Sequence, residues 1–176
     1  MAAGDLEAMA RVGYAWWIAR MRRTLSLVDA VRIDHFRGFY NYWEVPAGEK
    51  TAIRGRWLDG PGAELFHAAT TSLGGVAIIA EDLGVITPDV VALRDAFHLP
   101  GMKIIQFGFE GGAADAFLPH NYGTPHCVVY TGTHDNDTAR GWLETAAENE
   151  RAFALNYLNT IYDTFVWDLI RAVWAS

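Results

Sequence analysis

Short apolar segments that alternate with helix-forming segments constrain the fold of this chain more than any other feature. Four segments have the composition of buried strands: 30–36 (AVRIDHF), 76–80 (VAIIA), 102–109 (MKIIQFGF) and 127–131 (CVVYT). Helical patterns cover 5–26, the segment between Gly60-Pro61 and Gly74-Gly75, the segment from Thr87-Pro88 to before Pro100, and the chain from about Thr138 onward. Strands alternating with helices predict parallel βαβ units and the α/β fold class.

Composition excludes several classes of protein. The net charge is −7 and no basic run is longer than Arg22-Arg23, which argues against a nucleic-acid partner. The single cysteine, Cys127, excludes a disulfide framework. No apolar stretch approaches the length of a membrane span, and no secretory signal is recognisable at Met1. We therefore expect a cytoplasmic protein that does not act on membranes.

Carboxylates follow three of the four predicted strands. Asp34 closes the first strand, Glu81 follows the second and Asp135 follows the fourth. Active sites of α/β sheets and barrels form at the carboxyl ends of strands, so these side chains are expected to share a site. Two carboxyl groups about 5 Å apart suit retaining glycosidic chemistry, in which one attacks the sugar and the other donates a proton. Arg32 would point to the same face as Asp34 and keep it ionised.

Three segments carry a specific resemblance to a known family. VRIDHFRGF (31–39), IIAEDLGVITP (78–88) and VYTGTHDNDT (129–138) resemble, in this order, the signature blocks of glycoside hydrolase family 77, the 4-α-glucanotransferases or amylomaltases. The likeness extends from about Met9 to about Leu143.

The resemblance implies a role for each of these residues. Asp34 would be the nucleophile that forms a β-linked glycosyl-enzyme, Glu81 the general acid and base, and Asp135 the third carboxylate. Arg32 and His134 would flank the nucleophile and bind the sugar. The reaction implied is the transfer of an α-1,4-glucan segment to the 4-hydroxyl of an acceptor sugar, with no cofactor.

Further residues are weaker candidates for substrate binding. His35 lies next to the nucleophile, and Tyr40 and Trp43 follow it with rings that can stack on glucose. His120 and Asn121 lie in the long Gly- and Pro-rich loop 110–126, where the resemblance suggests a wall of the active site. The histidines show neither H-x-x-x-H spacing nor accompanying cysteines, so no metal site is expected.

The chain is short for the fold that the resemblance implies. A (β/α)8 TIM barrel takes about 250 residues, so we expect residues 1–176 to be the central part of a catalytic barrel, roughly strands four to seven with their helices, incomplete at both ends. We expect such an open part to aggregate or dimerise, and to have little transferase activity alone with maltotriose or amylose. The alternatives are an α-amylase-type hydrolase, which would transfer the sugar to water, and a non-catalytic glucan-binding module.

Overall fold

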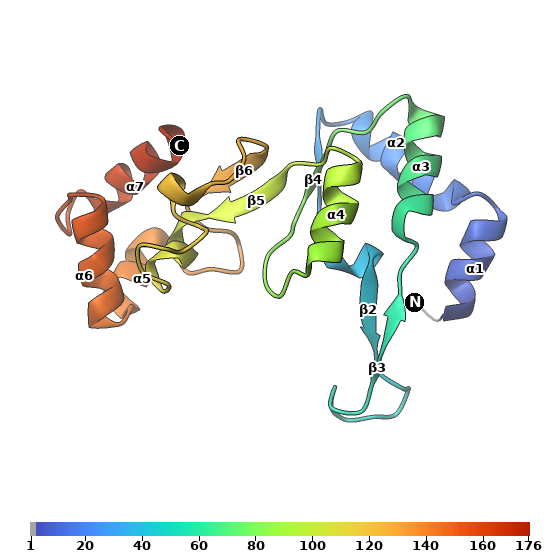
Figure 1. Cartoon of the computed structure of the whole chain (residues 1–176), viewed down its shortest axis with the longest axis horizontal. Coiled ribbons are helices and arrows are strands. Elements are labelled where there is room, and N and C mark those ends of the chain that lie inside the picture. The colour runs from blue at the N-terminus through green and yellow to red at the C-terminus, as the bar shows by residue number, and fades with distance from the viewer. Residues whose placement is uncertain (1–2) are drawn as a thin grey trace. The chain divides into compact units, whose positions relative to one another are not determined.

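The computed structural model describes residues 3–176, which divide into two compact units between Gly101 and Met102 (Figure 1). Each unit has its own hydrophobic core and contains both helices and strands. The mixed α/β class predicted from the sequence is thus confirmed. Within residues 3–176 no helix is both long and apolar enough to cross a bilayer.

The first unit is built around a parallel strand pair. Its elements are α1 (Ala3–Arg11), α2 (Ala15–Leu25), β1 (Val31–Ile33), the 3₁₀ helix η1 (Phe36–Phe39), β2 (Asn41–Glu44), β3 (Arg56–Asp59), α3 (Gly62–Leu73), β4 (Ile78–Ala80) and α4 (Pro88–Ala96). Strands β1 and β4 pair in parallel, with Ile33 opposite Ala80. The chain reaches β4 from β1 through α3, as expected of parallel strands.

The single helix predicted over 5–26 is wrong, because the chain breaks it between α1 and α2. Gly13 and Tyr14 both have left-handed backbone, with φ of 59° and 56°, which no right-handed helix can continue through. Tyr14 is held there by its own side chain, which is 6% exposed and donates a hydrogen bond to Glu64 at 3.1 Å. Burial, followed by this contact, raises the pKa of Tyr14.

Two predicted strands are too long. Strand β1 ends at Ile33, so Asp34 and His35 lie in a turn and Phe36 begins η1. Strand β5 (Gly101–Ile104) likewise passes into the 3₁₀ helix η2 (Ile105–Phe109). Phe36 and Phe109 are nevertheless buried, so their apolar character reflects the core and not a strand. A short apolar run has the same appearance in either conformation.

Helix ends in the first unit follow local chemistry. Thr87 is the N-cap residue of α4 and Pro88 its first residue, as predicted. Helix α3 begins at Gly62, one residue after Pro61, and is capped at Gly74, whose φ of 74° suits a left-handed C-cap.

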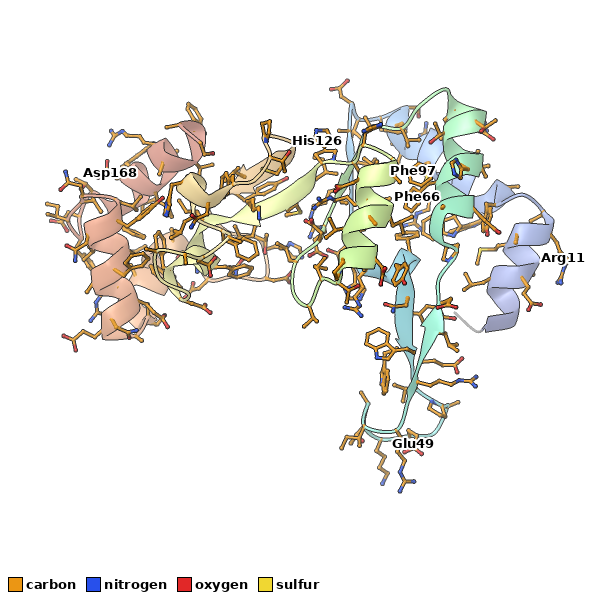
Figure 2. All side chains as sticks on the ribbon, viewed as in Figure 1. Arg11, Glu49, Phe66, Phe97, His126 and Asp168 are labelled. Carbon is orange, nitrogen blue, oxygen red and sulfur yellow. The ribbon has the colours of Figure 1, made fainter. Side chains whose placement is uncertain are left out.

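The aromatic core of the first unit is centred on α3. This helix buries Phe66 against Phe36 and Phe39, with ring centroids 5.6 and 5.4 Å apart. Phe66 also faces Phe97 after α4, at 5.3 Å (Figure 2).

The hairpin of β2 and β3 was not predicted from the sequence. The two strands pair antiparallel, with Asn41 opposite Asp59 and Trp43 opposite Trp57. They project from the rest of the first unit, with Glu49 in the connecting loop (Figures 1 and 2). Each strand is only four residues long, and a polar loop separates them, so neither produces a clear periodic signal.

The second unit pairs β5 with β6 and covers them with helices. Its remaining elements are η3 (Pro119–Asn121), β6 (Cys127–Tyr130), α5 (Ala139–Thr145), α6 (Glu148–Tyr157) and α7 (Phe165–Trp174). The fully buried side chains of its core include Leu118, Leu143 and Phe165.

A carboxylate in the first turn of α7 supplies a pH-dependent contribution to stability. Thr160 donates to Asp168 at 2.5 Å and Arg171 at 2.6 Å, and these contacts, that of Thr160 first, lower the pKa of Asp168 (Figure 2). A lowered pKa of Asp168 stabilises the fold at pH values above the ordinary pKa of an aspartate. This stabilisation is lost as the pH falls through the folded-state pKa.

We therefore expect Asp168→Asn to lower the melting temperature at neutral pH, and the deficit to shrink as the pH falls below about 4. Thermal unfolding of both proteins between about pH 7 and pH 3 measures this, with Asp163→Asn as the control at an exposed carboxylate. A deficit that is the same at every pH would contradict the assignment.

Candidate active site

The carboxyl ends of β1 and β4 lie side by side and present Asp34 and Glu81. Ile33 and Ala80 are paired, so each carboxylate residue is the first beyond its strand. The backbones remain joined there, because Glu81 N–H donates to the Ile33 carbonyl and Phe36 N–H donates to the Glu81 carbonyl, both at 3.0 Å. The fold thus brings two of the three predicted carboxylate residues to one end of one strand pair.

The Glu81 carboxylate is fixed by two backbone amides. One oxygen accepts from His35 N–H at 2.6 Å and the other from Leu83 N–H at 2.9 Å. The left-handed backbone of His35, with φ of 49°, forms the turn from which its N–H points to Glu81. The turn that follows Asp34 is therefore attached directly to the Glu81 side chain.

Asp34 is oriented by Arg32 and remains open to solvent. The Arg32 guanidinium donates to Asp34 at 2.7 Å, and the Asp34 side chain is 70% exposed. A cavity of about 400 Å³ adjoins the pair, within the usual size range of small-molecule sites. Its lining consists of Trp17, Arg20, Met21, Thr24, Val31, Arg32, Ile33, Asp34 and Phe39. The R-x-D spacing thus produces the contact expected for two residues on one face of a strand.

A buried ion pair supports the segment that follows β4. The Asp82 side chain is 8% exposed and forms an ion pair with Arg94 of α4, which is 16% exposed. Gly101 packs closely against both, since a Cβ there would lie 2.5 Å from Asp82 Oδ2 and 2.8 Å from Arg94 Nη1. Sequence reasoning missed Arg94, which lies twelve residues from Asp82 on a helix.

Asp135 and His134 belong to the second unit, where they follow β6. Both are exposed, by 76% and 73%, and His134 Nε2 lies 3.4 Å from Asp135 Oδ1. The side chain of Asn136 closes this turn by accepting from Thr133 N–H at 2.8 Å. The side chains of His134 and Asp135 are therefore available to a ligand.

The N-cap residue of α5 is Thr138, whose side chain accepts from Gly141 N–H at 3.0 Å. Asp137 instead accepts from Thr138 N–H at 2.7 Å. Either side chain is a suitable cap on chemistry alone, and the backbone path decides between them.

The residues that follow Asp34 have different exposures. His35 is exposed, whereas Tyr40 is half-buried and its pKa is raised, first by burial and then by Asp89. Trp43 is 40% exposed and donates through Nε1 to the Ala52 carbonyl at 2.8 Å. Trp43 therefore presents an open ring, and Tyr40 is directed toward α4.

His120 and Asn121 brace the long loop of the second unit. His120 contacts the Tyr157 hydroxyl and the Ala113 carbonyl, each at 2.8 Å. Asn121 donates to the carbonyls of Ala113 and Asp115, both at 2.8 Å. Both ring nitrogens of His120 are thus engaged, one with Tyr157 of α6 and the other within the loop, and contact of either residue with a substrate stays a prediction.

Residues 3–176 contain no group of three or more His, Cys, Asp or Glu side chains arranged to hold a metal ion.

Comparisons with known proteins agree on one family. The family model described as 4-alpha-glucanotransferase matches residues 1–176. The chain is 49% identical to a 4-alpha-glucanotransferase of Synechocystis over 98% of its length, and 54% identical to one of Thermus thermophilus over 86%. These matches cover 34% and 31% of the two relatives, so the chain spans about a third of their length.

Two solved structures that match the chain are amylomaltases. An amylomaltase from Streptococcus agalactiae in complex with acarbose matches with a TM-score of 0.91 and 36% identity, over 97% of this chain and 35% of that one. An amylomaltase from Corynebacterium glutamicum matches with a TM-score of 0.64 and 21% identity, over 93% of this chain and 23% of that one, a likeness of fold alone.

Proposed function

The chain belongs to the 4-alpha-glucanotransferase family, glycoside hydrolase family 77, and we propose that it supplies the catalytic carboxylates for transfer of α-1,4-glucan segments between sugars. The observation that carries the proposal is the arrangement at the paired ends of β1 and β4. There Asp34 is open and paired with Arg32, and Glu81 is fixed to the turn that follows Asp34. Retaining glycosidic chemistry uses two carboxyl groups, and the presence of Asp34 and Glu81 at adjacent strand ends supports the proposal.

The fold proposed for the parent protein is a (β/α)8 barrel. In this proposal residues 1–176 are its central part, and β1, β4, β5 and β6 are roughly strands four to seven. The parallel β1–β4 pair connected through α3 and the TM-score of 0.91 to an amylomaltase support it. The carboxyl ends of the strands are then the face where a barrel places its active site.

In the first chemical step Asp34 attacks the anomeric carbon of the donor glucan. A bond forms between this carbon and an Asp34 oxygen while the glycosidic bond breaks, and Glu81 gives its proton to the departing 4-oxygen. Each oxygen of a carboxyl group has two lone-pair positions, so the backbone contacts of Glu81 leave room for that proton. The hydrogen bond from the Arg32 guanidinium orients Asp34 for attack.

In the second step the 4-hydroxyl of an acceptor sugar displaces Asp34 from the anomeric carbon. Glu81, now a carboxylate, removes the hydroxyl proton while the acceptor oxygen bonds to the anomeric carbon and the ester to Asp34 breaks. Both carboxyl groups return to their initial states, and the anomeric configuration is retained. No cofactor is needed for this sequence.

The remaining predicted residues are proposed to bind the glucan. Asp135 would hold sugar hydroxyls as the third carboxylate, with His134 beside it. His35, Tyr40 and Trp43 would contact the sugars near the nucleophile, and His120 and Asn121 would shape a wall of the cleft. The substrates proposed are maltooligosaccharides, amylose and related dextrins. A cytoplasmic location is likewise a proposal, and the names of plant relatives place those proteins in chloroplasts or amyloplasts.

The test separates an enzyme from a binding module. In the natural polypeptide that contains residues 1–176, Glu81→Gln should leave the dissociation constant for maltoheptaose within about twofold and reduce transfer by about 10²–10⁴-fold. Transfer is followed as the appearance of longer and shorter glucans from maltotriose, and Glu110→Gln, at an exposed carboxylate, is the matched control.

Glucan binding by the wild-type and Glu81→Gln proteins alike, with no transfer by either, would favour a binding module. Glucose release by the wild type without longer products would favour a hydrolase of the α-amylase type. Either result would contradict the proposed transfer.

A further inference from the structure

We propose that one face of the β2–β3 hairpin is an additional binding surface for the glucan chain, with Trp57 as its central residue. This inference rests on the proposed function, because the ligand is the same α-1,4-glucan. It assigns a role to Trp57 and Arg37, which no sequence pattern identified as binding residues.

The register of the hairpin places two indole rings next to each other. Side chains alternate between the faces of a strand, and Trp43 is directly opposite Trp57, so both lie on one face. Their ring centroids are 5.5 Å apart, with the planes at 67°. They are 40% and 53% exposed, respectively. Two large rings left open on a short hairpin form a continuous apolar surface that is not needed for the core.

The two rings are held in position before any ligand binds. Trp43 is fixed by its hydrogen bond to the Ala52 carbonyl and by Gly55, where a Cβ would lie 2.6 Å from the ring atom Cε2. The Arg37 guanidinium lies 4.5 Å from the centroid of the Trp57 ring. A surface that is already ordered loses little conformational entropy on binding.

Polar atoms without partners lie beside the rings. Asn41 and Asp59 share the face of the two tryptophans, two register positions away. Asn41 Oδ1 is a buried acceptor and Arg37 Nε a buried donor, and neither has a hydrogen-bond partner among the described residues.

The charges of the hairpin favour a neutral ligand. Glu44 pairs with Arg56 at 2.8 Å, and Glu49 lies 3.9 Å from Arg54. These pairs cancel most of the local field, so a strongly charged ligand would gain little here. A glucopyranose ring has no charge and presents C–H groups that pack against an aromatic face, while its hydroxyls reach polar side chains at the edge.

Arg37 connects this surface to the carboxylates. It lies three residues after Asp34, and its guanidinium donates to the carbonyl of Val85 in the loop that follows Glu81. The same guanidinium stacks on Trp57. Arg37 thus links the Trp57 ring to the segments that carry Asp34 and Glu81, and the inference predicts that long glucans benefit from the hairpin more than short ones.

The experiment compares long and short ligands in the natural polypeptide that contains residues 1–176. Calorimetry in the Glu81→Gln background gives dissociation constants for maltoheptaose and maltotriose without turnover. We expect Trp57→Ala to weaken maltoheptaose binding about tenfold and maltotriose binding less than twofold. Trp57→Phe, which keeps a ring, should restore most of the affinity.

The matched control is Trp16→Ala. Trp16 is 56% exposed, has an edge-to-face partner in Trp17 and lies under Arg20, so it repeats the environment of Trp57 on a helix. It should change neither dissociation constant. Unfolding midpoints of all variants show that the hairpin substitution does not act through loss of the fold.

Equal maltoheptaose affinity with and without the Trp57 ring would overturn the inference. So would a change of oligomeric state on Trp57→Ala with unchanged glucan affinity, which would identify the face as a protein contact. Transfer by the wild type is measured separately. If the wild type shows no transfer but Trp57 still affects binding according to chain length, the catalytic proposal is contradicted and the binding surface is supported.

Discussion

Asp34→Asn should reduce glucan transfer by about 10³-fold or more, since it removes the proposed nucleophile. An amide oxygen at the same position cannot form the ester that carries the sugar. Because the Asp34 side chain is exposed, the substitution should change the free energy of unfolding little. The fold should stay the same, and the loss should appear in the rate constant of transfer. The measurement is the rate of disproportionation of maltotriose by purified wild-type and variant proteins.

A glycosyl fluoride separates the two carboxylates. Fluoride departs without protonation, so α-maltotriosyl fluoride should restore the first step in Glu81→Gln but not in Asp34→Asn. The control is Asp29→Asn, an exposed aspartate in the loop before β1, which should change the rate by less than about twofold. Retention of a tenth or more of the wild-type rate by Asp34→Asn would show that another group attacks the sugar.

The largest expected effect on stability is that of Arg94→Ala. The substitution leaves the Asp82 carboxylate, which is 8% exposed, without its guanidinium partner. Breaking a buried pair from one side costs about 3 kcal/mol of unfolding free energy, because the remaining charge stays desolvated. Chemical denaturation of the wild-type and variant proteins measures the difference.

Two further substitutions make this prediction specific. Adding Asp82→Asn to Arg94→Ala should recover part of the loss, since the uncompensated charge is removed. Arg54→Ala breaks an exposed 3.9 Å contact with Glu49 and should change stability by less than about 1 kcal/mol. An Arg94→Ala protein as stable as Arg54→Ala would mean that the pair is of no structural importance.

Features with a local cause were predictable from the sequence. Thr87-Pro88 specifies the start of α4 because a proline fits the first turn of a helix, and Gly74 ends α3 because its φ is positive. The apolar run that contains β4 and the carboxylate after it also identified the strand end that carries Glu81.

Features that depend on distant contacts were missed. The break between α1 and α2 depends on the burial of Tyr14 and its bond to Glu64, fifty residues away. The Arg94 partner of Asp82 lies on another element, and the β2–β3 hairpin is stabilised across its strands and not within them. Neither propensity nor periodicity encodes such pairings.

The signature blocks identified the family, and the family model over residues 1–176 confirms it. They also specify which carboxylate is expected to attack, which geometry alone does not decide. The individual roles of Asp34, Glu81 and Asp135 stay predictions, as do those of the sugar-binding residues.

The most direct test is to trap the covalent intermediate. When the Glu81→Gln protein reacts with α-maltotriosyl fluoride, the sugar should lose fluoride and form an ester with Asp34. The second step should then stop, because no base is present to activate the acceptor hydroxyl. Peptide mass spectrometry should find one maltotriosyl group on the peptide that contains Asp34, and none in the Asp34→Asn protein. An adduct on another residue, or fluoride release with no adduct at Asp34, would contradict the assignment of Asp34 as nucleophile and Glu81 as acid and base.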